Sequence, residues 1–163
     1  MFRPLLIEDA EIWKTFLNDD RATAYFPDFM KGNNPLRALH WVEKQICRYR
    51  DLKGGLLAII DKETGRFVGQ SGLIVQDVGG TEEVEIGYHL LPEYWGKGFA
   101  TEAAMFFKDL AFSSFQIKHL VSNIDVRNMP SQKVAERNGM ERAEQIQWKE
   151  LDIFVYRTSS RNK

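Results

Sequence analysis

The sequence predicts an α/β protein with one mixed sheet that is flanked by helices. Between residues 56 and 91, three strand-like segments follow one another across short turns. Two stretches at helical spacing precede this run. A helix, a strand, a second helix and a strand pair follow it. The length of 163 residues suits one domain, so we expect a single domain over residues 1–163 with a polar tail from about residue 159.

The part before the sheet is predicted to hold one short strand and two helices. Residues 2–5 are the candidate strand. Asp9 is a plausible N-cap for the first helix. Asn34-Pro35 marks the start of the second, because a capping residue is followed by proline in the first turn. Gly54-Gly55 ends that helix.

Three predicted strands, 56–60, 67–75 and 83–91, form the centre of the sheet. Thr64-Gly65 and Gly79-Gly80 mark the turns between them. Side chains alternate between the two faces of a strand. One face of the third strand therefore carries Val84, Ile86, Tyr88 and Leu90, and the other carries Glu83, Glu85, Gly87 and His89.

The remaining residues alternate helix and strand before a closing pair of strands. A helix runs from about Gly98 to Ser113, and its small inner residues allow close approach to a sheet or a ligand. A strand over 119–126 and a short helix over 128–138 follow. The closing strands cover 140–148 and 151–158.

Composition excludes several classes of function. The formal net charge of -1 leaves no overall basic field for nucleic acid or for an anionic membrane. The N-terminus lacks a signal-peptide h-region and no apolar run is long enough to span a membrane, so we expect a cytoplasmic protein. The single cysteine, Cys47, precludes an internal disulfide and favours a reducing compartment. The three histidines are scattered, so no metal site is expected.

The turn Trp95-Gly96-Lys97-Gly98 lies between the third strand and a helix. Backbone N–H groups at such a turn can converge on a phosphate, and glycine lets the main chain come close. The alternative is an ordinary strand-to-helix turn. The segment matches neither the dinucleotide fingerprint nor the P-loop, because Thr101-Glu102 and Phe99 stand at required positions.

Two sequence blocks at a fixed separation resemble a known family. The first comprises Glu85-Ile86-Gly87-Tyr88, Leu91-Pro92 and the run Tyr94–Ala103. The second comprises Asn128–Ser131 and Val134–Met140. Together they resemble the GNAT superfamily of N-acetyltransferases, and within it the branch that contains RimJ and RimL.

This resemblance extends from about Arg3 to Thr158 and implies a fold, a co-substrate and a site. In the family fold, a mixed sheet flanked by helices has one strand that splays from its neighbour, and acetyl-CoA binds there. The family motif Gln/Arg-x-x-Gly-x-Gly/Ala falls on Trp95–Ala100, with Trp95 in place of the usual Gln or Arg. The cofactor-binding residues implied are His89, Leu90 and Leu91 for the pantetheine arm, Trp95, Gly96, Lys97, Gly98, Phe99, Ala100 and Thr101 around the pyrophosphate, and Asn128 and Ser131 near the sulfur.

Acetyl transfer to an amine needs a base, an oxyanion donor and an acid. A lysine amine has a reference pKa near 10.4 and an α-amine about 7.7–8.0, so the amine must be deprotonated, and a carboxylate can take the proton directly or through water. Glu85 is the predicted base. Backbone N–H groups near Leu90 are the predicted oxyanion donors, and Ser131 is the predicted acid. Many family members use a tyrosine at the position of Ala135, so that tyrosine is absent.

Each of these residues also has an ordinary structural interpretation. Glu85 follows Glu82 and Glu83 and could belong to a solvated acidic face, Ser131 could cap its helix, and Cys47 reads as a core residue. We interpret His89 as a packing residue. Tyr25, Phe26, Phe29 and Trp41 could line an acceptor pocket or fill the core, and Glu144 and Glu150 are weaker candidates for the base.

Three functions remain open at this point. The first is acetylation of a protein N-terminus, which needs an open groove with an acidic mouth. The second is acetylation of a small amine such as a polyamine, an aminoglycoside or an amino acid, which needs an enclosed pocket. The third is a coenzyme A-binding sensor without turnover. Family members are often homodimers, and the sequence does not specify the assembly.

Overall fold

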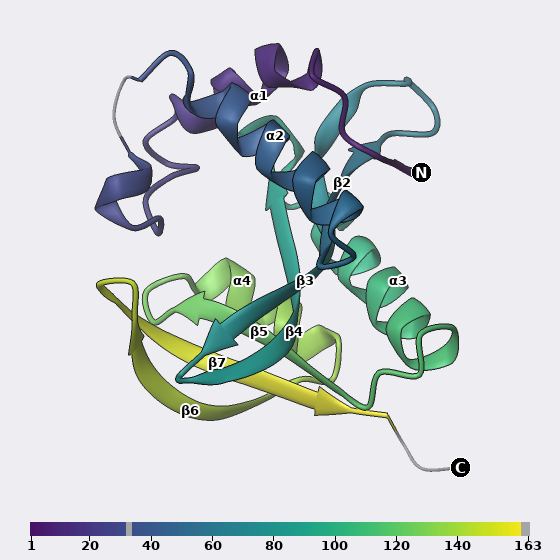
Figure 1. Ribbon diagram of the computed structural model, residues 1–163, viewed down its shortest axis with the longest axis vertical. Coiled ribbons are helices and arrows are strands. Elements are labelled where there is room, and N and C mark those ends of the chain that lie inside the picture. The colour runs from purple at the N-terminus through teal and green to yellow at the C-terminus, as the bar shows by residue number, and fades with distance from the viewer. Residues whose placement is uncertain (32–33, 161–163) are drawn as a thin grey trace.

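The computed structural model describes residues 1–31 and 34–160, without the side chain of Phe29. In these residues a seven-stranded sheet has the order β1-β2-β3-β4-β5-β7-β6 (Figure 1). Every neighbouring pair is antiparallel except β4 and β5, which are parallel. The predicted α/β class with one mixed sheet is confirmed.

The elements follow the predicted order along the chain. The strands are β1 (Phe2–Arg3), β2 (Gly54–Ile60), β3 (Phe67–Val78), β4 (Thr81–Leu90), β5 (His119–Asp125), β6 (Glu141–Trp148) and β7 (Leu151–Ser159). The helices are α1 (Asp9–Leu17), α2 (Arg37–Arg50), α3 (Phe99–Ser113) and α4 (Met129–Arg137), with 3-10 turns η1 (Asp28–Met30) and η2 (Pro92–Tyr94). Ser159 belongs to β7, so the predicted tail begins at or after Ser160, and residues 161–163 lie outside the described part.

Helices cover both faces of the sheet. On one face α1 and α2 pack on Ala58 and Ile60 of β2 around the fully buried Trp13. On the other face α3 packs on Leu73 and Ile86, and α4 packs beside it. The alternation of β4 follows the prediction. Glu85, Gly87 and His89 face α1 and α2, whereas Val84, Ile86, Tyr88 and Leu90 face α3.

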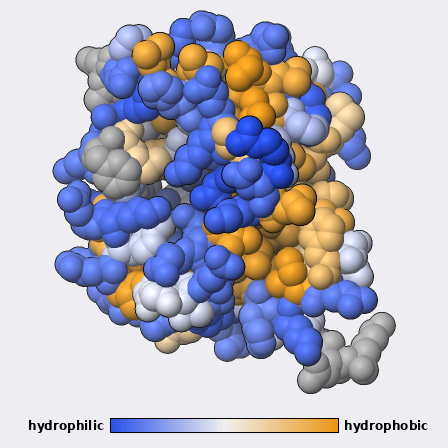
Figure 2. Space-filling view, in the orientation of Figure 1, coloured by the Kyte–Doolittle hydropathy of each residue, from blue (hydrophilic) through white to orange (hydrophobic). Residues whose placement is uncertain are grey.

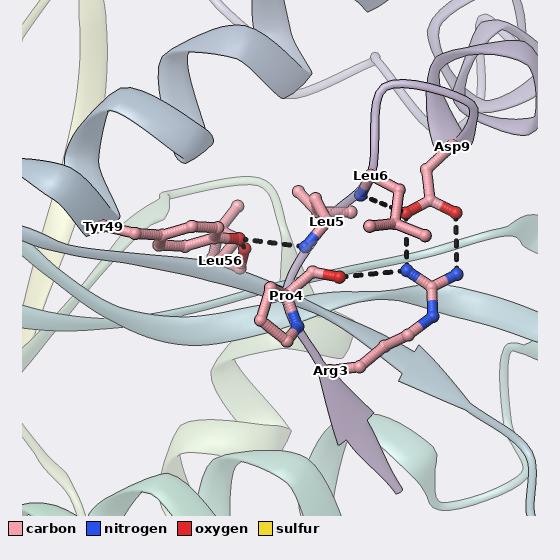
Figure 3. Close-up of polar contacts among 7 residues, drawn as sticks. All are labelled: Arg3, Pro4, Leu5, Leu6, Asp9, Tyr49 and Leu56. Atoms are coloured by element: carbon pink, nitrogen blue, oxygen red, sulfur yellow. Dashed lines mark hydrogen bonds and ion pairs between the residues drawn. The ribbon is translucent and has the colours of Figure 1, made fainter.

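An ion pair fixes the N-terminal segment onto α1 (Figure 3). Arg3 donates two hydrogen bonds to Asp9, at 2.7 and 2.8 Å, and the Leu6 N–H donates a third at 2.8 Å. Asp9 thus lies within the first turn of α1 rather than at the N-cap, which is Glu8. Burial alone would raise the pKa of Asp9, but the bonds from Arg3 and Leu6 outweigh burial and lower it.

Tyr49 ties α2 to the start of β2 on the same face (Figure 3). Its hydroxyl accepts a hydrogen bond from the Leu5 N–H at 3.4 Å and donates one to the Leu56 carbonyl. Burial raises the pKa of Tyr49 to about 12, so the hydroxyl stays protonated and remains a donor. This link holds α2 across the sheet and fixes which of its side chains face β4.

The β6–β7 hairpin closes the opposite end of the sheet. Lys149 and Glu150 form its turn with φ values of 47° and 69°. The Trp148 indole N–H donates to the Asp77 carbonyl at 3.1 Å, which fastens the hairpin to the end of β3. The tip lies on the same side of the molecule as η1 (Figure 1). The hairpin therefore faces the segment that joins α1 to α2.

The surface is divided between polar and apolar regions. Polar residues cover most of the side that carries β6, and apolar residues gather over α3 (Figure 2). Cys47 lies exposed on α2, so its prediction as a core residue is wrong: it stands on the polar face of an amphipathic helix. None of the helices in the described residues is long and apolar enough to cross a membrane.

Replacing Asp9 by asparagine should lower the free energy of unfolding by about 1.5–3 kcal/mol, because it removes hydrogen bonds to a charged partner. The folded-state pKa of Asp9 is lowered, so this stabilisation is present above the unfolded pKa near 3.9 and is lost as pH falls through the folded value. Chemical denaturation of wild type and D9N at several pH values measures both effects.

The matched control is Glu11→Gln on the same helix. Glu11 pairs with Lys14 at 2.6 Å, but both side chains are exposed, so the loss should stay below about 1 kcal/mol. Equal losses in D9N and E11Q would contradict a stabilising role for the Arg3–Asp9 pair.

Candidate active site

The site begins where β4 and β5 separate. These parallel strands pair at one register position, Glu85 with Val121, and diverge beyond it. At the fork the Ser122 hydroxyl donates to the Ile86 carbonyl at 3.0 Å. Continued pairing would have closed this part of the sheet. Because β4 and β5 do not pair beyond Glu85 and Val121, a gap between these strands connects the two faces of the sheet, as the family resemblance implied.

One cavity of about 1360 Å³ occupies the fork and reaches both faces of the sheet. Toward α3 and α4 it is lined by the glycine-rich turn and by Asn128 and Ser131. Toward α1 and α2 it is lined by Glu85, His89 and the aromatic side chains of Tyr25, Phe26 and Trp41. The fork therefore joins two half-sites of different chemistry.

The glycine-rich turn presents bare main chain to the cavity. Gly96 and Gly98 have φ values of +73° and +89°, in the left-handed region that glycine favours. A Cβ at either position would meet nothing within 4 Å. Gly98 is the N-cap of α3, and no side chain caps that helix. The N–H groups of Phe99, Ala100 and Thr101 lie in the first turn of α3, where an anion can bind, and these residues line the cavity.

Trp95 and Lys97 take positions that sequence reasoning did not anticipate. The Trp95 indole N–H donates to the Leu90 carbonyl at 2.8 Å, so the residue that replaces the family's Gln or Arg holds the end of β4 in place. The Lys97 ammonium lies 5.4 Å from the centre of the Tyr94 ring and outside the cavity lining.

The peptide groups of β4 differ in their availability to a ligand. The Leu91 N–H donates to the Val68 carbonyl at 3.0 Å, and its side chain is buried outside the cavity. In an antiparallel ladder alternate residues bond to the partner strand. His89 therefore bonds to β3, while Tyr88 and Leu90 turn their N–H groups toward the gap. His89 and Leu91, the backbone groups that the resemblance implied, therefore direct their N–H groups to β3, and the N–H groups that face the gap belong to Tyr88 and Leu90.

Asn128 and Ser131 begin α4 at the other wall of the gap. The Asn128 side chain caps the helix by accepting from the Ser131 N–H at 3.2 Å. Tyr88 donates its hydroxyl to the Ser131 carbonyl at 2.9 Å, which ties α4 to β4. The Ser131 hydroxyl has no partner among the described residues. Ala135 is buried beside Ile124, so no tyrosine hydroxyl reaches the gap from this position.

Glu85 is a buried carboxylate at the fork, with 9% of its surface exposed, and not part of a solvated acidic face. Its Oε2 accepts from Gln76 Nε2 and from Asn123 Nδ2, the latter at 3.1 Å. Burial is the largest influence and raises its pKa, although these two amides and the charge of Lys149 act in the opposite direction. A carboxylate with a raised pKa is a stronger base than a solvated one.

His89 sits in an aromatic cage on the same face as Glu85. Its ring contacts Phe16, Phe26 and Trp41 edge-on, with centroids 5.3–5.9 Å apart. Burial lowers the pKa of His89 to about 4. The imidazole is therefore neutral at physiological pH and too weak a base to compete with Glu85. The interpretation of His89 as a packing residue agrees with this environment.

Sequence reasoning missed five polar residues on the α2 side of the cavity. Gln76 and Asn123 hold Glu85. Asn123 lies on the predicted strand 119–126, whereas Gln76 lies one residue beyond the predicted strand 67–75 and belongs to β3 because that strand extends to Val78. Lys44, Arg48 and Lys149 line the same wall. Their proximity depends on how α2 and the β6–β7 hairpin pack, so no local pattern signals it. No group of three potential metal ligands occurs among the described residues.

Comparison with known proteins agrees with this geometry. Residues 1–141 match the acetyltransferase (GNAT) domain family. An uncharacterised protein of Bacillus subtilis strain 168, YkkB, is 30% identical over 156 residues, covering 95% of this chain and 88% of YkkB. The crystal structure of an acetyltransferase from Agrobacterium tumefaciens has a TM-score of 0.81 at 26% identity, covering 98% of this chain and 90% of its own.

The protein therefore belongs to the GNAT acetyltransferase family, whose members take an acetyl group from acetyl-CoA. RimJ of Mycobacterium smegmatis, solved with CoA-disulfide, shares the fold at a TM-score of 0.77, covering 98% of this chain and 81% of RimJ. At 21% sequence identity, this likeness supports a shared fold and nothing further. The expected family is confirmed, and the RimJ/RimL branch stays a prediction.

The cage around His89 makes a prediction about its titration. The imidazole should stay neutral from pH 8 down to about 5, with a midpoint near pH 4. The unfolded chain binds this proton at about pH 6.5, so folding stability should fall as pH drops from 6.5 toward 4. NMR titration of the ring protons measures the midpoint, and H89Q assigns the resonance. A midpoint above pH 6 would show that the cage is open to water.

Proposed function

We propose that the protein transfers the acetyl group of acetyl-CoA to a primary amine, with acetyl-CoA on the α3 side of the fork and the amine on the α2 side. The observation that carries the proposal is the single cavity that runs from the first turn of α3 to Glu85. We call its two halves the CoA half and the acceptor half. They meet where β4 and β5 separate.

The CoA half offers main-chain donors where phosphates and an amide-rich arm need them. The amides from Gly96 to Thr101 suit the pyrophosphate, because bare N–H groups at a helix N-terminus bind anions. The N–H groups of Tyr88 and Leu90 suit the pantetheine arm or the thioester oxygen. Asn128 and Ser131 form the facing wall.

Glu85 is the proposed base of the acceptor half. Its Oε2 is held by Gln76 and Asn123, which leaves Oε1 with only a 3.5 Å contact to the Asn123 N–H. Oε1 can therefore take a proton from an incoming ammonium, directly or through water. The free amine then attacks the thioester carbonyl across the fork.

Two groups on the CoA half complete the chemistry. The oxygen of the carbonyl under attack becomes negative, and the Leu90 N–H is a donor fixed in direction by the sheet. The departing thiolate needs a proton, and the Ser131 hydroxyl is unpartnered within the described residues and lines the cavity. Ser131 thereby serves in place of the tyrosine that Ala135 replaces.

Gly98→Val should abolish binding of coenzyme A, because a branched side chain would occupy the space that the turn leaves open. In the wild type, coenzyme A at about 100 times its Kd should stabilise the fold by roughly 2.7 kcal/mol. A thermal-shift titration with coenzyme A, NAD and ATP measures this effect, and NAD and ATP should shift little.

The matched control is Gly65→Val in the β2–β3 turn. Gly65 also has a positive φ, +68°, with nothing within 4 Å of the place a Cβ would take, and it lies outside the cavity lining. Both variants should lose similar stability from backbone strain, but only G98V should lose the response to coenzyme A. Normal binding by G98V would place the phosphates elsewhere.

Glu85→Gln and Ser131→Ala should lower the turnover number by about 10²–10⁴-fold while the affinity for acetyl-CoA changes little. E85Q should recover part of its rate at high pH, because the amine then arrives unprotonated. S131A should not recover, because the thiolate still lacks a donor. Turnover against pH for the three proteins separates the roles. Equal activity in all three would remove both residues from the mechanism.

A further inference from the structure

The wall of the acceptor half is positively charged. Lys44 and Arg48 stand one turn apart on α2, and Lys149 reaches the cavity from the β6–β7 turn. Among the described residues that line the cavity, two carry a carboxylate: Glu85 and Asp125. Asp125 is already paired with Arg127 at 2.7 Å. Glu85 is therefore the one carboxylate in the described lining that forms no ion pair, and it shares the acceptor half with the three cations.

The three cations have no contacting carboxylate in the part of the chain that the structure describes, and Glu85 is the acidic group whose charge acts on Arg48 and Lys149. None of them forms an ion pair within the described residues; Arg48 donates to the Val75 carbonyl at 3.1 Å, and the Lys149 ammonium lies 3.7 Å from the centre of the Trp148 ring. Burial first, and then the charge of Arg48, lowers the pKa of Lys44. Burial first, and then the charges of Lys44 and Arg48, lower the pKa of Lys149, although the charge of Glu85 acts in the opposite direction.

Such a cluster costs folding free energy. Like charges at positions i and i+4 of a helix are destabilising, and partial burial increases the cost. The rigid elements nevertheless hold all three at one wall: Tyr49 fixes α2 on the sheet, and Trp148 fixes the hairpin on β3. An arrangement that is unfavourable in the empty protein becomes favourable when an anion enters.

We propose that the acceptor is a small primary amine that also carries a carboxylate or a phosphate, and that Lys44, Arg48 and Lys149 bind this anionic group. This inference rests on the proposed function and specifies its substrate class. The amine lies at Glu85 in the fork, and the anionic end points to the α2–hairpin wall. A polyamine would place its second ammonium against the same three cations, so the wall selects against it.

The charge distribution also bears on a protein N-terminus as acceptor. An open groove for a peptide α-amine needs an acidic mouth, and here the mouth carries Lys44 and Lys149, both exposed. Cations on the CoA half, such as Lys133 and Arg137 of α4, are available for the phosphates of the co-substrate. The α2–hairpin cluster lies on the opposite face of the sheet and is free for the acceptor.

The experiment compares matched amines that differ in charge. Glutamate is paired with glutamine, and phosphoethanolamine with ethanolamine, beside spermidine as a cationic amine. The anionic member of at least one pair should have a kcat/KM at least about tenfold higher at low ionic strength. The two pairs distinguish a carboxylate from a phosphate. The preference should shrink in about 0.5 M salt, which screens exposed charges.

Variants at Lys149 test the wall itself. Lys149→Gln should raise KM for the anionic amine, Lys149→Glu should abolish or reverse the preference, and Lys149→Arg should keep it. KM for acetyl-CoA should stay unchanged throughout. The control is Lys62→Glu, which makes the same change in net charge as Lys149→Glu. Lys62 is an exposed residue of the β2–β3 turn and lies outside the cavity lining.

The outcomes separate this inference from the proposed function. Turnover of glutamine, ethanolamine or spermidine equal to that of the anionic amines overturns the inference and leaves the acetyltransferase proposal intact. A rise in KM for acetyl-CoA alone in Lys149→Gln also overturns it, because the cluster would then serve coenzyme A. If none of the amines in the panel leads to release of coenzyme A, the result contradicts the proposed function, and the inference falls with it.

Discussion

The site depends on a constraint of hydrogen bonding between two parallel strands. β4 and β5 share one register position, at Glu85 and Val121, and then separate. The peptide groups that a continuous sheet would have paired are thereby left facing a gap, where a buried donor without a partner is costly. The Trp95 indole satisfies the Leu90 carbonyl, and the N–H groups of Tyr88 and Leu90 remain for a ligand. The gap is thus both a passage and a set of oriented donors.

The two faces of the sheet give the two ends of this passage different chemistry. On the α3 side the lining is main chain at a helix N-terminus, which suits phosphate regardless of the rest of a ligand. On the α2 side the lining is side chain, with Glu85, an aromatic cage around His89 and three cations. A phosphate site made of main-chain N–H groups is determined by the local sequence of one turn. A wall made of side chains is determined by which helices and strands pack together. The acceptor half is therefore where a shared fold can differ in substrate.

This distinction explains how much could be predicted from the sequence. The strand alternation that sets Glu85 opposite Ile86, and the glycines that open the turn at Gly96 and Gly98, are local patterns, and the family resemblance carried the rest of the fold. The register that makes Leu90 rather than Leu91 available needed the pairing of β4 with β3. The cation cluster combines residues about a hundred positions apart. Because only tertiary packing brings Lys149 to α2, the sequence offered no signal for it.

The same field that would hold an anionic group also acts on the reacting amine. Burial and neighbouring cations lower the pKa of Lys44 and of Lys149, and the same cations disfavour the charged form of an ammonium held near them at Glu85. Burial meanwhile raises the pKa of Glu85. The two shifts bring the acid and the base of the first proton transfer toward each other, which is the condition under which general base catalysis is effective. The anionic group of the acceptor would keep the substrate bound while its ammonium is disfavoured, so the cations contribute to attraction and to deprotonation, and burial contributes the raised pKa of the base.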